Sequence, residues 1–273
     1  MSEEKKEVQE KVEEKVEQKT PESVPDKPKF PSEIVDLPSE GKVYPKEHAC
    51  SSGQVEIKYM TAREEDILTS QNLIEKGHVI KHLLDSLIMT PGVVSDDLAL
   101  GDKNALMVAA RILAYGPEYT CKVTNPTTQD EFEHSFNLTE CTFKKVPDDV
   151  NGQSEFDISL PISKVNCKFK ILTGRDETQI EKDILGNQKL NKDINTSMTT
   201  RMIHSITEVD GNRDRGFISN FVLNMLARDA LSLRVEMNRV TPDIELTQMI
   251  EHGGQVIQVD IPLTTEFFWP TTI

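Results

Sequence analysis

The chain has 273 residues, 37% of them hydrophobic and 28% charged, which fits one or two globular domains. Its formal net charge of −15 argues against a nucleic-acid-binding protein, because phosphate binding needs a basic face. Four cysteines stand far apart without a CxxC pair, which predicts reduced thiols rather than disulfides or zinc ligands. No apolar run approaches the roughly 20 residues of a transmembrane helix, and the charged N-terminus lacks the apolar centre of a secretory signal.

Residues 1–29 are distinguished by their many glutamates and lysines. Val8, Val12 and Val16 would share one stripe of a helix, but prolines from Pro21 onward would stop that helix. Because this composition offers little apolar area to bury, we expect a charged and mostly disordered arm. The alternative is a helix that forms when the arm docks on a partner.

The block LPSEGKVYP, from Leu37 to Pro45, opens an extended region. Pro38 and Pro45 favour β or polyproline geometry at the residue before each of them, which for Pro45 is Tyr44. Gly41 predicts a turn between the two prolines.

The segment VEIKYM, from Val55 to Met60, has the alternation of a half-buried strand. Val55, Ile57 and Tyr59 would share the buried face, because charged residues stand between them.

A capped helix is predicted from Thr61 to Ser70. Thr61 and Glu64 have the spacing of a capping box, in which each side chain bonds the backbone amide of the other residue. Glu64, Glu65 and Asp66 fall in the first turn, where the helix dipole favours acidic side chains.

Two further helices are expected before residue 117. Apolar residues at helical spacing follow Gly77, and Pro91 ends their run. Asp102 is the expected N-cap of a helix over residues 103–115, which Gly116 terminates.

The next region predicts strands. Alternating apolar residues mark strands over 119–123, 132–138, 156–160 and 167–171, the last two as a hairpin. Residues 146–154, rich in Pro, Asp, Asn and Gly, are the candidate boundary. They separate an N-terminal part over residues 30–145 from a C-terminal part over residues 155–273.

The C-terminal part is predicted to mix helices and strands. We expect a polar helix over 173–195, a strand over 198–209 and a turn at 210–212. An amphipathic helix over 218–226 follows, and Asp229 is the expected cap of the next one. A β-hairpin closes this part. The expected fold class is therefore α+β, with small hairpins or sheets and amphipathic helices beside the charged arm.

Phe267, Phe268 and Trp269 are consecutive aromatic residues, and Pro270 follows them. As a strand, this segment would place Phe267 and Trp269 on one face and Phe268 on the other. Two roles stay open, because aromatic residues serve both as core anchors and as contacts in assemblies.

No group of residues predicts a catalytic or cofactor site. Two of the acids Glu64, Glu65 and Asp66 could be imagined as the general acid/base pair of a glycoside hydrolase, but placement of acids in a helix's first turn explains them better. His78 and His82 would supply two metal ligands from one helix face, without an HExxH motif or nearby Cys to complete the site. Walker loops, nucleophile elbows and dinucleotide fingerprints are absent from the sequence. We therefore expect neither enzymatic activity nor a cofactor.

Five blocks occur in order along the chain: LPSEGKVYP, VEIKYMTAREEDIL, GDKNALMVAARILAYGPEY, VTPDIEL and FFWP. Together they resemble the family of T4-type tailed-phage baseplate proteins, which includes the baseplate hub subunit and the baseplate hub assembly catalyst. The resemblance spans residues 30–270, and none of its blocks is a catalytic motif. Cysteine pairs in the β-hairpins of some relatives have no counterpart in turns 124–130 and 251–254 here, so no metal is implied.

The resemblance implies a structural protein of the baseplate hub, made in the cytoplasm of the infected bacterium and placed in the virion tail. Its partners would be other hub proteins, and a homo-oligomer is a further expectation. The alternatives are a transient assembly factor that is absent from the finished virion and, in a different class, a tail-associated cell-wall hydrolase.

Overall fold

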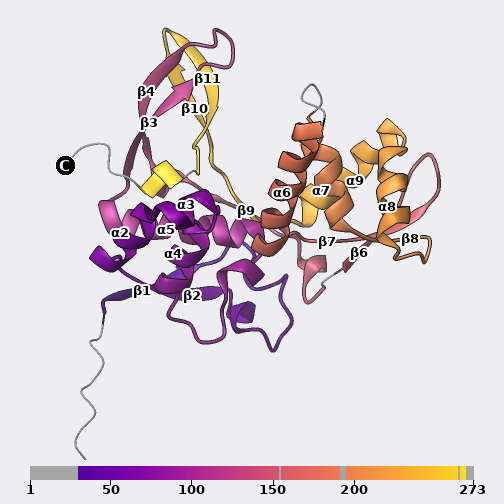
Figure 1. The fold of residues 1–273 in the computed structure, drawn as a ribbon, viewed down its shortest axis with the longest axis horizontal. Helices are drawn as coiled ribbons and strands as arrows, with labels where there is room; N and C mark the ends of the chain where they lie inside the picture. Colours follow the sequence, from indigo (N-terminus) through magenta and orange to yellow (C-terminus); the bar gives the residue numbers. More distant parts are fainter. Residues whose placement is uncertain (1–29, 154, 191–194, 264, 269–273) are drawn as a thin grey trace, which may run out of the picture. The chain divides into compact units, whose positions relative to one another are not determined.

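The computed structural model describes residues 30–153, 155–190, 195–263 and 265–268. The chain divides into a unit over Met1–Pro31 and a unit over Ser32–Ile273, and the second unit is described here. It has the predicted α+β fold, with small antiparallel sheets and helices (Figure 1). The predicted arm over residues 1–29 lies outside the described residues. None of the described helices is long and apolar enough to cross a membrane.

Within the described residues, the strands form five small antiparallel sheets. The pairs are β1 (Ser32–Asp36) with β2 (Gln54–Lys58), β3 (Glu118–Thr124) with β4 (Glu131–Asn137), β5 (Phe143–Lys144) with β9 (Asp243–Ile244), β6 (Glu155–Ser159) with β7 (Asn166–Lys170) and then β8 (Ile206–Val209), and β10 (Thr247–His252) with β11 (Gln255–Asp260). The predicted hairpin over residues 156–171 is confirmed by the register that pairs Phe156 with Phe169.

The α-helices of the described residues are mostly short. They are α2 (Ala62–Thr69), α3 (Gln71–Glu75), α4 (Val79–Leu87), α5 (Leu100–Tyr115), α6 (Gly174–Leu190), α7 (Ser197–Ser205), α8 (Arg215–Leu223) and α9 (Ala227–Val240). Single 3-10 turns are η1 (Ala49–Ser52), η2 (Ser95–Asp97), η3 (Leu138–Glu140), η4 (Asp148–Val150) and η5 (Thr265–Phe268). Helix α8 begins at an N-cap, Asp214, whose carboxylate accepts a hydrogen bond from the Phe217 amide at 2.8 Å.

Buried hydrophobic residues gather in two clusters. The first contains residues between Leu37 and Leu138 together with residues between Ile244 and Phe268. The second contains residues between Val146 and Val240. The cores are therefore divided differently from the predicted division into residues 30–145 and 155–273, because the end of the chain returns to the first core. Strands β5 and β9 pair with each other, and in the sequence they come directly before and after the residues of the second cluster.

The hairpin β3–β4 and the hairpin β10–β11 lie side by side (Figure 1). The ring of Phe132 stacks on the ring of His252, with 3.7 Å between their centroids. Across the described ranges, no group of three His, Cys, Asp or Glu side chains is arranged to hold a metal ion.

The predicted strand over residues 198–209 is wrong in its first part. Residues Ser197–Ser205 form helix α7, and only Ile206–Val209 form strand β8. Threonine and isoleucine in this segment favour a strand by propensity, which is a weak preference that tertiary packing overrides. Met202 and Ser205 are both buried, at the three-residue spacing that places side chains on one helix face.

The predicted C-terminal strand is also wrong. Thr265–Phe268 form the 3-10 turn η5, and the side chains of Phe267 and Phe268 are both fully buried in the first core. A helical turn lets both rings enter one core, whereas consecutive side chains of a strand point to opposite faces. Trp269 and Pro270 lie outside the described residues.

Candidate functional site

Asp102 in the first turn of α5 joins this helix to the block from Leu37 to Pro45. Its buried carboxylate accepts hydrogen bonds from the Ser39 amide at 2.9 Å and from the Tyr44 hydroxyl at 2.6 Å. The Tyr44 hydroxyl in turn accepts from the Ala99 amide at 2.9 Å. One carboxylate therefore fixes the block against the start of α5.

The prediction that Asp102 is an N-cap is wrong. Helix α5 begins at Leu100, three residues before the predicted start, with Ala99 at the N-cap position. Asp229 shows the same difference in α9, whose N-cap is Leu226. Both aspartates occupy the third helical position and accept hydrogen bonds from a distant loop. For Asp229, the donors are the amides of residues 162 and 163, at 2.8 and 3.0 Å.

Burial raises the pKa of Asp102 above its usual range, although the donated hydrogen bonds from Tyr44 and Ser39 oppose the rise. Burial likewise raises the pKa of the Tyr44 hydroxyl. The Tyr44 ring stacks on His48 at a centroid distance of 4.8 Å. This site is built from buried groups that hold one another, which suits a structural role.

Gly41 supplies the predicted turn of the block. Its φ of +78° lies in the left-handed region, and a Cβ atom there would lie 2.4 Å from the Ser51 carbonyl oxygen. A side chain is therefore excluded both by conformation and by space. Pro38 is buried beside this turn, and Pro45 is exposed.

Replacing Tyr44 with phenylalanine should lower the free energy of unfolding by about 2 kcal/mol, because the Ala99 amide and the Asp102 carboxylate would both lose a buried partner. The matched control is Tyr59→Phe, since the Tyr59 hydroxyl makes only an exposed hydrogen bond of 3.3 Å to Glu33. Urea unfolding curves of both variants measure the effect. Equal stability losses in the two variants would contradict the role assigned to the Tyr44 hydroxyl.

Glu64 in α2 forms a second buried polar group. One oxygen accepts from the Lys58 ammonium at 2.7 Å and the Ser86 hydroxyl at 2.6 Å, and the other from the Thr61 amide at 2.9 Å and hydroxyl at 2.6 Å. The predicted capping box of Thr61 and Glu64 is confirmed. Because Lys58 ends β2 and Ser86 lies in α4, this carboxylate joins three elements.

The ionisation of Glu64 follows from these contacts. Burial raises the pKa of Glu64, but the hydrogen bonds from Lys58, Ser86 and Thr61 outweigh burial and lower this pKa to about 2. The carboxylate is fully buried and accepts four hydrogen bonds. It is therefore ionised and fully engaged, which leaves it unsuited to transfer protons to a substrate.

The other candidate residues near Glu64 lie apart from this network. Glu65 is exposed and accepts a 3.4 Å hydrogen bond from the Tyr115 hydroxyl. Met60 is partly buried against the first core. Tyr59 is partly exposed after the end of β2.

Arg111 of α5 holds the C-terminal aromatic segment. Its Nε atom donates to the Phe267 carbonyl oxygen at 3.0 Å, and its terminal nitrogens donate to the carbonyls of Gly116 and Glu118 at 3.3 and 3.4 Å. The Phe267 ring packs edge-on against Tyr119, with 4.8 Å between centroids. Sequence reasoning missed Arg111; the available signal was a single cation within an otherwise apolar helix segment.

Gly101 of α5 allows a close approach by the segment that contains β9. A Cβ atom at Gly101 would lie 2.1 Å from the Pro242 carbonyl oxygen and 2.6 Å from the Asp243 Cα atom. Apart from its first residue, helix α5 lies in the block GDKNALMVAARILAYGPEY, and it contacts three of the other four sequence blocks. It contacts LPSEGKVYP through Asp102, VTPDIEL through Gly101 and FFWP through Arg111. The remaining block, VEIKYMTAREEDIL, contacts α5 through the Tyr115–Glu65 hydrogen bond.

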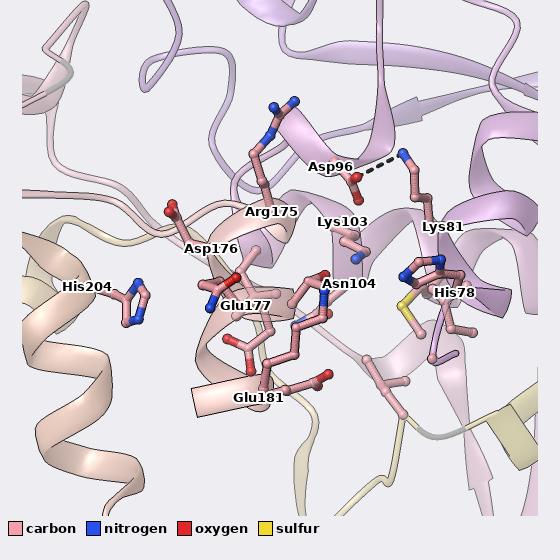
Figure 2. A pocket seen from close by; sticks show the side chains of 18 residues that line it. His78, Lys81, Asp96, Lys103, Asn104, Arg175, Asp176, Glu177, Glu181 and His204 are labelled. Atoms are coloured by element: carbon pink, nitrogen blue, oxygen red, sulfur yellow. Dashed lines mark ion pairs between the residues drawn. The ribbon is translucent and has the colours of Figure 1, made fainter. Parts of the chain in front are cut away.

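A charged cavity of about 790 Å³ adjoins α5 (Figure 2). It is bounded chiefly by α4, η2, α5 and α6, and its lining includes cations and anions: Lys81, Lys103, Arg175, Lys182, Asp96, Asp176, Glu177 and Glu181. Lys81 and Asp96 form an ion pair of 2.8 Å. Sequence reasoning missed this cavity, because its walls come from segments whose approach no local pattern indicates.

The fold and these networks define a class of protein: an α+β chain whose small sheets and helices are joined through buried polar contacts around α5. A model of the family described as T4 bacteriophage base plate protein matches residues 30–266. The chain belongs to this family, and the resemblance to T4-type baseplate proteins is thereby confirmed. No curated protein and no solved structure matches the chain.

Proposed function

We propose that this baseplate protein is a structural component of the baseplate hub and acts through contacts with other hub proteins. The family match over residues 30–266 is the observation that supports this proposal. The hub position rests on the resemblance of the five sequence blocks. Assembly in the cytoplasm of the infected bacterium and residence in the virion tail belong to the same proposal.

A role without catalysis is part of this proposal. Among the acids Glu64, Glu65 and Asp66, only Glu64 is buried. It accepts four hydrogen bonds within the fold. Glu65 is exposed, so the two carboxylates have different environments. These contacts support a scaffold whose polar groups stabilise the fold.

Exposed apolar side chains support binding to other proteins. Leu231 and Val235 stand one turn apart on α9 and are 53% and 62% exposed, and Leu226 at the start of this helix is 51% exposed. A large apolar residue exposed alone is common, whereas neighbouring ones mark interaction surfaces. This part of α9 is therefore available for contacts within a baseplate.

Mass spectrometry of purified phage tails tests the proposal. We expect the chain in finished tails at a fixed ratio to other baseplate proteins. Its presence in assembly intermediates alone would replace the proposal with the second candidate, a transient assembly factor. A peptidoglycan zymogram provides the control for the hydrolase alternative, and we expect no clearing.

A further inference from the structure

Lys103 lies in an unfavourable position for a cation. It stands in the first turn of α5, where the positive end of the helix dipole repels it. Burial lowers the pKa of Lys103, although the charges of Asp96, Glu181 and Glu177 oppose this shift. The Lys103 ammonium lies beside Gly174, where a Cβ atom would be only 3.2 Å from Lys103 Nζ.

Of the three acids whose charges act on Lys103, Asp96 and Glu177 are paired with other cations, whereas Glu181 is an exposed residue of α6. Asp96 pairs with Lys81 at 2.8 Å, and Glu177 pairs with Arg201 through contacts of 2.5 and 2.7 Å. Figure 2 shows Lys103 among the labelled side chains of the cavity, with the Lys81–Asp96 pair on one side. Within the described ranges, Lys103 forms no ion pair of 4.0 Å or less and no side-chain hydrogen bond.

A partly desolvated ammonium without an acceptor lowers stability, and an added carboxylate would relieve this cost. The cavity around Lys103, at about 790 Å³, is within the size range of sites that take small organic ligands. It is therefore large enough for a side chain together with neighbouring groups of a peptide.

The lining also restricts the charge of an occupant. Four carboxylates, those of Asp96, Asp176, Glu177 and Glu181, line the cavity. They would repel a multiply charged anion such as phosphate. A single carboxylate, carried by a segment that is otherwise polar, would be repelled least by these four carboxylates while it accepts a hydrogen bond from the Lys103 ammonium.

We propose that this cavity receives an aspartate or glutamate side chain of another baseplate protein, with the Lys103 ammonium as its ion-pair partner. This inference rests on the proposed function and names the chemistry of one contact within the baseplate. Lys182, which also lines the cavity, adds a second cation beside the entering segment.

Carbodiimide cross-linking of purified tails tests the contact. The carbodiimide adds to a carboxylate to form an O-acylisourea; the neutral amine of Lys103 attacks its acyl carbon, and a urea leaves as the amide forms. The carbodiimide thus takes up the water that amide formation releases. Mass spectrometry should find Lys103 joined to an Asp or Glu of a different baseplate protein in tails, and joined only to its own chain in the isolated protein.

Two variants provide the controls. Lys103→Met should abolish the cross-link and lower incorporation into tails about tenfold, the effect of losing about 1.4 kcal/mol of binding free energy, while its melting temperature stays at or above that of the wild type. Lys189→Met, at an exposed position of α6, should change neither the cross-link nor incorporation.

The outcomes separate this inference from the proposed function. If the chain is present in tails but Lys103 gives only products within its own chain, or a product with a second copy, this inference is overturned and the proposed function stands. Normal incorporation of a folded Lys103→Met variant overturns it as well. Absence of the chain from tails overturns the proposed function and this inference together.

Discussion

Replacing Glu64 with alanine should lower the free energy of unfolding by about 3–5 kcal/mol, the typical effect of breaking a buried ion pair. The change removes the carboxylate from the buried Lys58 ammonium and also removes the acceptor of the Ser86 hydroxyl and the Thr61 amide. Chemical unfolding of the purified protein at neutral pH measures the loss. The matched control is Glu65→Ala one residue away, whose exposed side chain should contribute less than about 0.5 kcal/mol.

The pH dependence of the Glu64 variant gives a sharper test. A carboxyl group whose pKa is lowered by folding stabilises the protein above its unfolded pKa, and this stabilisation is lost as the pH falls toward the folded value. The stability difference between wild type and Glu64→Ala should therefore be full at neutral pH and shrink between about pH 4.5 and pH 2. A difference that is unchanged over this range would show that the ionised carboxylate is not the stabilising group.

Replacing Gly101 with alanine should lower the free energy of unfolding by about 3 kcal/mol, at the upper end for overpacking. The added methyl carbon would meet backbone atoms of Pro242 and Asp243 at 2.1 and 2.6 Å. Backbone cannot rotate away as a flexible side chain can, so α5 and the segment of β9 must move apart. Thermal unfolding should show a melting temperature lower by about 6–12 °C.

Gly186→Ala is the control for this substitution. Gly186 lies in α6 with nothing within 4 Å of a Cβ atom, so alanine should stabilise the helix by about 0.5–1 kcal/mol. A Gly101→Ala variant as stable as the wild type would contradict the contact between α5 and the β9 segment. A Gly186→Ala variant that is destabilised as much as Gly101→Ala would show that the loss does not come from this contact.

The parts of the fold that are set by local pattern were predictable. The hairpin of β6 and β7 follows from alternating apolar residues around a turn, and helix α4 follows from apolar residues at helical spacing. The capping box of Thr61 and Glu64 is also local, because both residues belong to one helical turn. Such features depend on few residues that are close in sequence.

Features that depend on distant segments were not predictable. An aspartate near a helix start favours a cap, yet Asp102 and Asp229 occupy the third helical position and bond distant loops. The sequence cannot distinguish these positions, because the loops that supply the donors approach only in the folded chain. For the same reason, the partners of Glu64 on other elements and the position of Lys103 in a cavity became visible only in three dimensions.

The return of the chain to its first core has a consequence for its synthesis. Residues 146–240 are complete before residues 244–268 leave the ribosome, and domains generally fold as they emerge. Phe267 and Phe268 can therefore join the first cluster only after every residue of the second cluster has been made. During this interval the nascent chain leaves exposed the apolar surface that the C-terminal segment later covers, including the ring of Tyr119 on β3.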